Sequence, residues 1–307
     1  MIDKYNSIID LVQAFKTEED CIKHLEKIRW NGNVVSPFDA TSKVYVCSNN
    51  RYKCKNTGKY FNVKVGTIFE DTKIALIKWF MALYIFESHK KGISSHQLAK
   101  DIGVTQKSAW FILHRLRYGF AHPNFERTLS GDIELDETYM GGDEKNKHAD
   151  KKTKGSQGRS TKTKKPVFGL LERGGEVVAH VVDDTKQKTL EPIITTTLCK
   201  VDNVFTDEWH AYNNLNKKYN HSVVHHAANE YVNGLAHTNG IENFWSHMKR
   251  GVDGIYHWVS VKHLQSYVDE FSLRFNTRKL NESGRFDLTL FYMMNRRLTY
   301  DNLTQKV

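Results

Sequence analysis

Three acidic residues that lie far apart in the sequence have the types and surroundings of metal ligands. Asp136 lies in the run Glu-Leu-Asp-Glu-Thr, Asp207 ends the run Asn-Val-Phe-Thr-Asp, and Glu242 lies in His-Thr-Asn-Gly-Ile-Glu. Magnesium prefers oxygen ligands and is usually held by one or two carboxylates together with water. Two such ions about 4 Å apart can assist both the attacking and the leaving oxygen in phosphoryl transfer. The three acids predict this chemistry if the fold brings them together.

The elements around these acids predict a sheet that could position them. Short β-like runs follow one another in the second half of the chain, at 133–139, 167–171, 177–182, 203–206 and 222–225. Helical patterns lie between and after the later runs, at 190–198, 208–215, 239–250 and 261–276. Three strands in succession, then alternating helices and strands, predict an α/β fold with a mixed sheet flanked by helices. The acids on the first strand, the fourth strand and a later helix are placed as a ribonuclease H-like fold requires.

The spacing alone leaves the choice of ligands open. Glu134 shares a strand face with Asp136, and Glu137 lies on the other face, so alternation along the strand does not select between them. Any single acid is also more often a helix cap or a surface group than a metal ligand. On the helix of Glu242, Trp245 belongs to the apolar stripe and is expected in the core beneath the acid.

A helix-turn-helix is predicted in the first half of the chain. Between residues 92 and 117, two helices with one apolar face each are separated by Gly103, and Thr105 can cap the second helix. Side chains at the start of that helix could reach base edges, and two arginines further along could contact phosphates. These candidate DNA contacts are Gln106, Lys107, Ser108, Arg115 and Arg117. The alternative is a purely structural helical hairpin.

Residues 31–72 predict a small β-ribbon module, because short β-like runs alternate there with turns that contain Asn and Gly. Zinc ribbons have this shape and need two paired ligand knuckles. The knuckle positions here are Ser36 to Asp39 and Cys54 to Thr57, and only Cys54 is a good zinc ligand. We therefore expect a ribbon that keeps its shape without metal, with zinc binding as the alternative.

The charge of the chain predicts a polyanionic partner. The net charge is +10 and the isoelectric point is about 9.2, which point first to nucleic acid. The alternative is a basic surface that binds nothing. A loop at 142–166 holds nine Lys and Arg against three Asp and Glu, and beside an acidic site it could grip DNA phosphates. The candidates in this loop and at the end of the Glu242 helix are Lys151, Lys152, Lys154, Arg159, Lys249 and Arg250.

The remaining composition is that of a globular, multi-domain chain. The sequence has no apolar run long enough for a membrane span, no secretory signal is expected at its start, and its four scattered cysteines predict free thiols in a reducing compartment. We expect five segments: helices at 1–30, the zinc-ribbon-like module at 31–72, the helix-turn-helix region at 73–122, the catalytic domain at 128–280 and a helical extension at 281–307.

Three motifs are specific enough to indicate a family: residues 134–142 with the Lys-rich loop that follows, residues 207–212 and residues 237–245. They closely resemble motifs of the DDE transposases of a bacterial insertion-sequence family. Its members carry an amino-terminal zinc ribbon and helix-turn-helix and are related to the eukaryotic Merlin elements. The resemblance extends from about residue 18 to 300 and implies that Asp136 and Asp207 are the first two catalytic acids. The clearest departure is the ribbon, where the four-cysteine pattern of the family is reduced to one cysteine.

The third catalytic position varies in this family and is often Asn, whereas Merlin-like relatives use Glu. Both Asn239 and Glu242 are present here, about one helical turn apart. A carboxylate is the stronger magnesium ligand, so we assign Glu242 as the third ligand, with Asn239 orienting it or contributing an oxygen.

The resemblance implies a cytoplasmic, nucleoid-associated bacterial transposase with no membrane partner. Asp136, Asp207 and Glu242 would hold two Mg²⁺ or Mn²⁺ ions, and zinc is not expected. The protein would bind the terminal inverted repeats and target DNA, cleave one strand and join its 3′-hydroxyl to the target. A homo-multimer is implied, because two element ends must be paired. The rival interpretations are a ribonuclease H-fold nuclease without strand transfer and a catalytically inactive DNA-binding regulator derived from a transposase.

Overall fold

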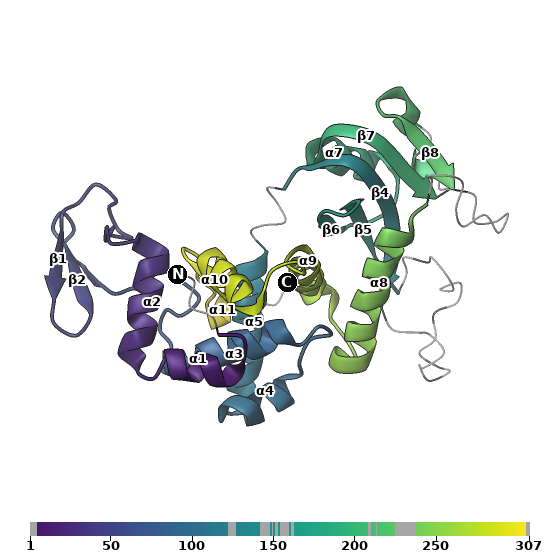
Figure 1. Cartoon of the computed structure of the whole chain (residues 1–307). Helices are drawn as coiled ribbons and strands as arrows, with labels where there is room; N and C mark the ends of the chain where they lie inside the picture. Colours follow the sequence, from purple (N-terminus) through teal and green to yellow (C-terminus); the bar gives the residue numbers. More distant parts are fainter. Residues whose placement is uncertain are drawn as a thin grey trace. The chain divides into compact units, whose positions relative to one another are not determined.

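The chain forms two compact units (Figure 1): residues 1–122 with 277–307, called unit 1, and residues 123–276, called unit 2. The computed structural model of the chain describes residues 5–121, 127–141, 163–207, 210–212, 214–224 and 237–304, together with residues 148, 150, 153 and 160. No helix within these described ranges is long and apolar enough to cross a membrane.

Unit 2 is built on a five-stranded mixed sheet, which confirms the predicted α/β architecture. Its strands are β4 (Leu129–Met140), β5 (Lys165–Glu172), β6 (Val177–Val181), β7 (Leu198–Asp207) and β8 (His221–Val224). The order across the sheet is β6-β5-β4-β7-β8. The first three strands pair antiparallel, whereas β7 runs parallel to both β4 and β8. The acid-bearing strands β4 and β7 are therefore neighbours.

Helices cover both faces of this sheet, because its central strands carry apolar side chains on each face. On β5, Val167 and Leu171 pack in one core with α8 (Asn239–Gly251) and α9 (Leu264–Asn276). The intervening Phe168 and Leu170 pack in a second core with α7 (Gln187–Thr197). Between them, Gly169 leaves room for α8, since a Cβ there would lie 2.5 Å from the ring of Trp245.

One predicted helix of unit 2 is wrong. The sequence predicts a helix at 208–215, but the described residues of this stretch form only short 3-10 turns, at His210–Tyr212 and Leu215–Lys217. Among the described residues of this stretch, the buried side chains are Tyr212 and Leu215. They lie three positions apart, which suits the tighter 3-10 geometry as well as an α-helix. Too few apolar residues follow to sustain a longer helix.

Unit 1 combines helices with a small sheet. Its helices are α1 (Ile8–Ala14), α2 (Glu18–Trp30), α3 (Leu76–Ser88), α4 (Ser95–Ile102), α5 (Gln106–Phe120), α10 (Glu282–Met293) and α11 (Tyr300–Thr304). Although α10 is distant in sequence, its Phe286 is fully buried and packs edge-on against Phe80 of α3. Helix α10 therefore belongs to the same core as α3.

The ends of helices α4 and α5 are set by capping residues that can be recognised in the sequence. Ser94 caps α4 by accepting from the amide of Gln97, and Thr105 caps α5 by accepting from the amide of Ser108. Gly103 ends α4 with a φ of 62°, a left-handed conformation that glycine adopts without strain.

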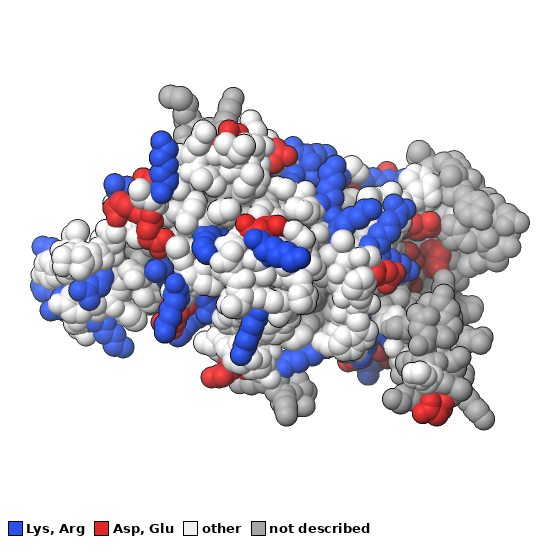
Figure 2. All heavy atoms as spheres, turned by 90° about the horizontal axis from the view of Figure 1, so that it is seen from below, with Lys and Arg blue, Asp and Glu red and all other residues white. Residues whose placement is uncertain are grey.

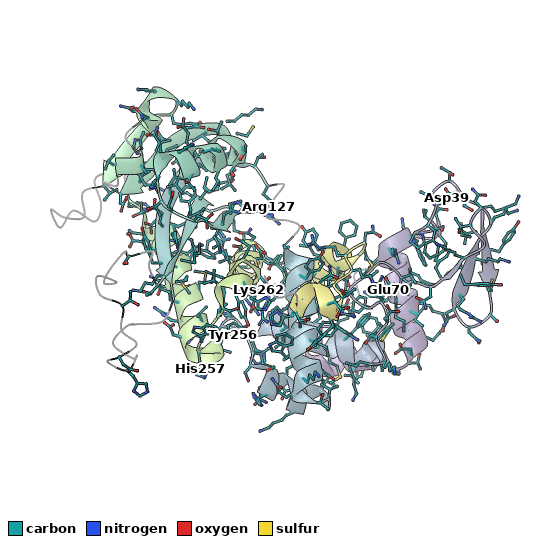
Figure 3. The ribbon with its side chains drawn as sticks, turned by 180° about the vertical axis from the view of Figure 1, so that it is seen from behind. Asp39, Glu70, Arg127, Tyr256, His257 and Lys262 are labelled. Carbon is teal, nitrogen blue, oxygen red and sulfur yellow. The ribbon has the colours of Figure 1, made fainter. Side chains whose placement is uncertain are left out.

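The small sheet of unit 1 contains β1 (Val44–Cys47), β2 (Arg51–Cys54) and β3 (Tyr60–Phe61), paired antiparallel in that order. Cys54 is fully buried, which by itself would raise its pKa. Hydrogen bonds from the hydroxyls of Ser36, Ser42 and Thr57 outweigh this effect and lower the pKa of Cys54 to about 6. Asn56 also donates to Asp39 at 2.7 Å (Asp39 is labelled in Figure 3). Polar contacts thus join the two predicted knuckles.

Candidate active site

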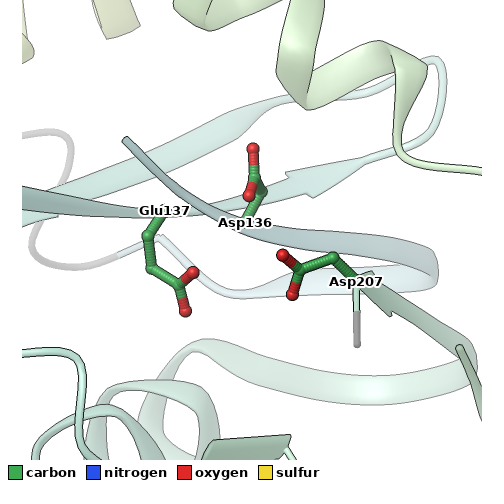
Figure 4. Close-up of side chains that lie close together, drawn as sticks. All are labelled: Asp136, Glu137 and Asp207. Carbon is green, nitrogen blue, oxygen red and sulfur yellow. The ribbon is translucent and has the colours of Figure 1, made fainter. Parts of the chain in front are cut away.

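Asp136, Glu137 and Asp207 lie together where β4 and β7 run side by side (Figure 4). The parallel register pairs Glu134 with Phe205, so two residues further on Asp136 and Asp207 are neighbours. Each of the three acids offers a carboxylate oxygen, and these oxygens all lie within 4.8 Å of one another. The structure therefore brings together the first two predicted ligands and adds Glu137.

The electrostatics of this group favour a bound cation. The pKa of Asp136 is raised to about 7, first by burial and then by the negative charges of Asp207 and Glu242. The indole of Trp245 acts in the opposite direction, because Nε1 donates to Oδ2 of Asp136 at 3.0 Å. Hard oxygen ligands held this close fit Mg²⁺ or Mn²⁺, since a divalent ion would offset the repulsion between them.

Glu137 is oriented by Tyr212, whose hydroxyl donates a hydrogen bond to Oε1 of Glu137. Burial and the Glu137 carboxylate raise the pKa of Tyr212 well above its usual value, so the phenol stays protonated and able to donate. Spacing along the strand does not choose between Glu137 and the other acids beside Asp136. Only the pairing of β4 with β7 brings Glu137 close to Asp207.

Glu242 lies in the first turn of α8 and outside that close group of carboxylates. Its side chain is exposed and accepts a hydrogen bond from Oγ1 of Thr238 at 2.8 Å. Its charge nevertheless raises the pKa of Asp136, so the two carboxylates influence each other. Asn239 is exposed at the first position of α8. The structure leaves both side chains accessible for the roles that the sequence predicts.

Glu134 has a different role from its neighbours on β4. Its side chain is 1% exposed and accepts from the backbone amide of Ile241 and from Nε of Arg173, both at 2.9 Å. Nδ1 of His237 lies 3.3 Å from its Oε1. Gly240 allows this approach, because a Cβ there would lie 2.8 Å from Glu134 Oε2. Glu134 therefore fastens the start of α8 to β4 instead of facing the close group of acids.

The predicted DNA contacts of unit 1 divide into exposed and buried residues. Gln106 and Lys107 are exposed, and Ser108 is half-buried, at the start of α5. Arg115 and Arg117 are 7% and 2% exposed, which corrects the expectation that they contact phosphates. Arg115 donates to the carbonyls of Ile68, Glu70 and Leu298, and Arg117 lies against the ring of Phe86. Periodicity alone could not show that α5 is enclosed on this side.

The predicted DNA contacts of unit 2 are described only at the end of α8. Lys249 and Arg250 are both exposed in its last turn. The four candidates of the basic loop, Lys151, Lys152, Lys154 and Arg159, lie outside the described residues.

Comparisons with known proteins show that unit 2 is similar to transposases. The model of the family described as ISXO2-like transposase domain matches residues 128–276. A protein of Halobacterium salinarum, described as an uncharacterized protein in transposable element ISH50, is 29% identical over 277 residues, covering 86% of this chain and 92% of that protein. An uncharacterized transposase-like protein of Haemophilus influenzae is 28% identical over 106 residues, covering 34% of this chain and 85% of that protein.

The residues that match the ISXO2-like transposase domain contain the whole acidic group. This match and the two relatives support the resemblance to the DDE transposases of insertion sequences that the motifs predict. A solved structure, the crystal structure of a pre-cleavage Mos1 transpososome, aligns with 92% of this chain and 95% of that chain at 10% identity. Its TM-score of 0.25 is too low to establish a common fold.

Proposed function

We propose that this transposase binds the ends of its element and catalyses metal-dependent DNA strand cleavage and strand transfer. The observation that carries the proposal is the meeting of Asp136 and Asp207 on adjacent parallel strands, with a third acid beside them. The strand order, with acids on the first and fourth strands and Glu242 on a later helix, supports a ribonuclease H-like catalytic domain. Such a site suits in-line displacement at a phosphodiester.

Asp136 and Asp207 would hold two divalent ions, either Mg²⁺ or Mn²⁺. When bound, they would supply charge stabilisation for the attacking and leaving oxygens. Glu242 would complete the set, with Asn239 orienting it or contributing an oxygen. Glu137, which Tyr212 holds near Asp207, is the other carboxylate within reach. Trp245 would keep Asp136 turned toward the ions.

Unit 1 and the end of α8 would hold the DNA. The exposed start of α5, with Gln106, Lys107 and Ser108, suits base contacts, and Lys249 and Arg250 suit phosphates. The ribbon module adds charge, because residues 40–69 contain six Lys and Arg and no Asp or Glu. Figure 2 shows Lys and Arg side chains spread over the surface. Two element ends must be paired for transposition, so a homo-multimer would form on the DNA.

The decisive experiment is a strand-transfer assay with DNA from the element's own ends, supplied either intact or pre-cleaved. Wild-type protein with Mg²⁺ should cleave the intact ends and join the pre-cleaved ones to target DNA. Asp136→Asn and Asp207→Asn should abolish both activities. Asp202→Asn is the matched control, because Asp202 is an exposed acid on the same strand as Asp207.

The assay also separates the rivals. Cleavage of intact ends without joining of pre-cleaved ends would identify a nuclease of the same fold. DNA binding with neither activity would identify a regulator. If Asp136→Asn left excision in cells unchanged, the catalytic proposal would be wrong.

A further inference from the structure

Unit 2 has a cavity outside the acidic group. It has a volume of about 570 Å³, within the usual range for pockets that hold small ligands. Its lining comes from the end of β4, the residues just before β5, the last turn of α8 and the segment after α8. It includes Tyr139, Gly141, Lys164, Lys249, Asp253 and Trp258. None of the three acids of the group lines it.

The indole of Trp258 is largely exposed to solvent. Trp258 is 69% exposed, and it is the one tryptophan among the large apolar side chains that are exposed in the described residues. Lys164 and Lys249 bring positive charge to the same cavity. An exposed indole face next to ammonium groups offers one surface for a flat ring and another for a phosphate.

The backbone that presents Trp258 is held in a rare conformation. A five-residue π-helix, Val252–Tyr256, follows α8, and His257 then has a φ of 58° and a ψ of −41°. The amide of Trp258 donates to the carbonyl of Tyr256 at 2.6 Å, so His257 is the centre of a tight γ-turn. Figure 3 shows Tyr256 and His257 in this turn. Strained residues of this kind persist where the surrounding structure fixes them, and they cluster at functional sites.

Tyr256 anchors the turn from the inside. Its hydroxyl donates to Oε1 of Glu270 at 2.6 Å, and its ring packs edge-on against Tyr267 at 4.8 Å. Glu270 is completely buried and is paired with Arg274 at 2.8 Å. The first residue of the turn is thus tied to α9, while the side chain of its last residue, Trp258, is exposed to solvent. This arrangement rigidly presents an aromatic side chain that the core does not use.

From these observations we propose that the cavity captures an unpaired nucleotide of the DNA strand held at the acidic group, with its base stacked on Trp258. Bases within a duplex are already stacked, so an exposed indole face selects a base that has left the duplex. Lys164 and Lys249 contact the flanking phosphates, and Asp253 offers an acceptor for an exocyclic amino group.

The position along β4 fits this occupant. Tyr139 lies three residues after Asp136, which corresponds to about 10 Å along an extended strand. One DNA strand advances about 3.4 Å per nucleotide, so the cavity lies roughly three nucleotides from the acids. The proposal rests on the proposed function, because it requires DNA to lie at the acidic group.

The test compares two DNA probes with the full chain: a blunt duplex and the same duplex with a short single-stranded extension that contains 2-aminopurine. Wild-type protein should prefer the extended probe and quench its fluorescence. Trp258→Ala should lower this preference roughly tenfold and abolish the quenching, whereas Trp258→Phe should retain most of both. Phe291→Ala, which truncates another exposed aromatic side chain at 58% exposure, should behave like wild type.

The outcomes distinguish this proposal from the function on which it rests. If wild-type protein binds the blunt duplex but Trp258→Ala leaves the preference and the quenching unchanged, the nucleotide pocket is wrong and the transposase function stands. If wild-type protein binds neither probe, both proposals fail. Equal losses on both probes for Trp258→Ala would also overturn the pocket, because they would indicate a general effect on DNA binding.

Discussion

The carboxylate of Glu134 accepts a hydrogen bond from the backbone amide of Ile241, 107 residues later, at 2.9 Å. This contact joins the strand of Asp136 to the helix of Glu242. Arg173 reinforces it by donating both to Glu134 and to the carbonyl of His237, the latter at 2.7 Å. The position of Glu242 relative to Asp136 is thus set by Glu134, a buried acid that lies outside the close acidic group.

Removal of Glu134 should destabilise unit 2. Glu134→Ala would remove the ion pair with Arg173, whose side chain is 18% exposed, and would leave the amide of Ile241 without its acceptor. Breaking a buried pair from one side costs roughly 3–5 kcal/mol, and denaturant unfolding should show a loss approaching this size. Glu191→Gln, which alters an exposed pair with Lys218, is the control and should have a much smaller effect. Equal losses in the two variants would contradict the anchoring role.

A methyl group at Gly240 should disturb the same contact. In Gly240→Ala the Cβ would lie 2.8 Å from Glu134 Oε2 and 3.1 Å from Leu171, so the start of α8 must shift. Overpacking of this kind costs about 1–3 kcal/mol, and strand transfer should fall because Glu242 moves with the helix. Gly254→Ala is the matched control, since no atom lies within 4 Å of its added Cβ. Full activity of Gly240→Ala would show that α8 tolerates the shift.

Asp136 should make the metal-free protein less stable at alkaline pH. Its pKa in the folded state, about 7, lies above the usual 3.8, so the folded state binds the proton more tightly. The stability from this proton is fully present below the usual pKa and is lost as the pH rises through about 7. Asp136→Asn should therefore raise the melting temperature at pH 8 by a few degrees in the absence of divalent ions.

Addition of Mg²⁺ at pH 8 should narrow or reverse this difference. The wild type would gain stability from the bound ion, whereas Asp136→Asn would gain little. Asp202→Asn should follow the wild type with and without Mg²⁺. If Asp136→Asn melts at a lower temperature than wild type at pH 8 without metal, the claim that the charged Asp136 destabilises the metal-free fold is wrong.

The ribbon module should remain folded without zinc. The thiol of Cys54 is held by three hydroxyls, and no group of three or more His, Cys, Asp or Glu ligands lies in the module within the described residues. Purified protein should contain less than one zinc per chain, and a chelator should leave its melting temperature unchanged. Cys54→Val should lower the melting temperature, because it leaves the hydroxyls unsatisfied. Cys54→Ser should lower the melting temperature less. Stoichiometric zinc with chelator-induced unfolding would overturn this expectation.

Local chemistry in the sequence is sufficient to predict much of this protein. Ser94 and Thr105 mark two helix starts, because their side chains satisfy backbone amides within one turn, and Gly103 marks the turn between them. The alternation of apolar residues predicts the strands that carry Asp136 and Asp207. The family motifs around them indicate a transposase before any contact is known.

Only the tertiary structure decides which polar side chains are free to act. Glu134 and Glu137 are equivalent by spacing, yet Glu134 is buried against Arg173 and Ile241, whereas Glu137 lies beside Asp207. Arg115 carries a charge that suits phosphate, but the segments packed around α5 supply carbonyls that bind it instead. These roles depend on partners that are tens to more than a hundred residues away, and no local pattern in the sequence contains them.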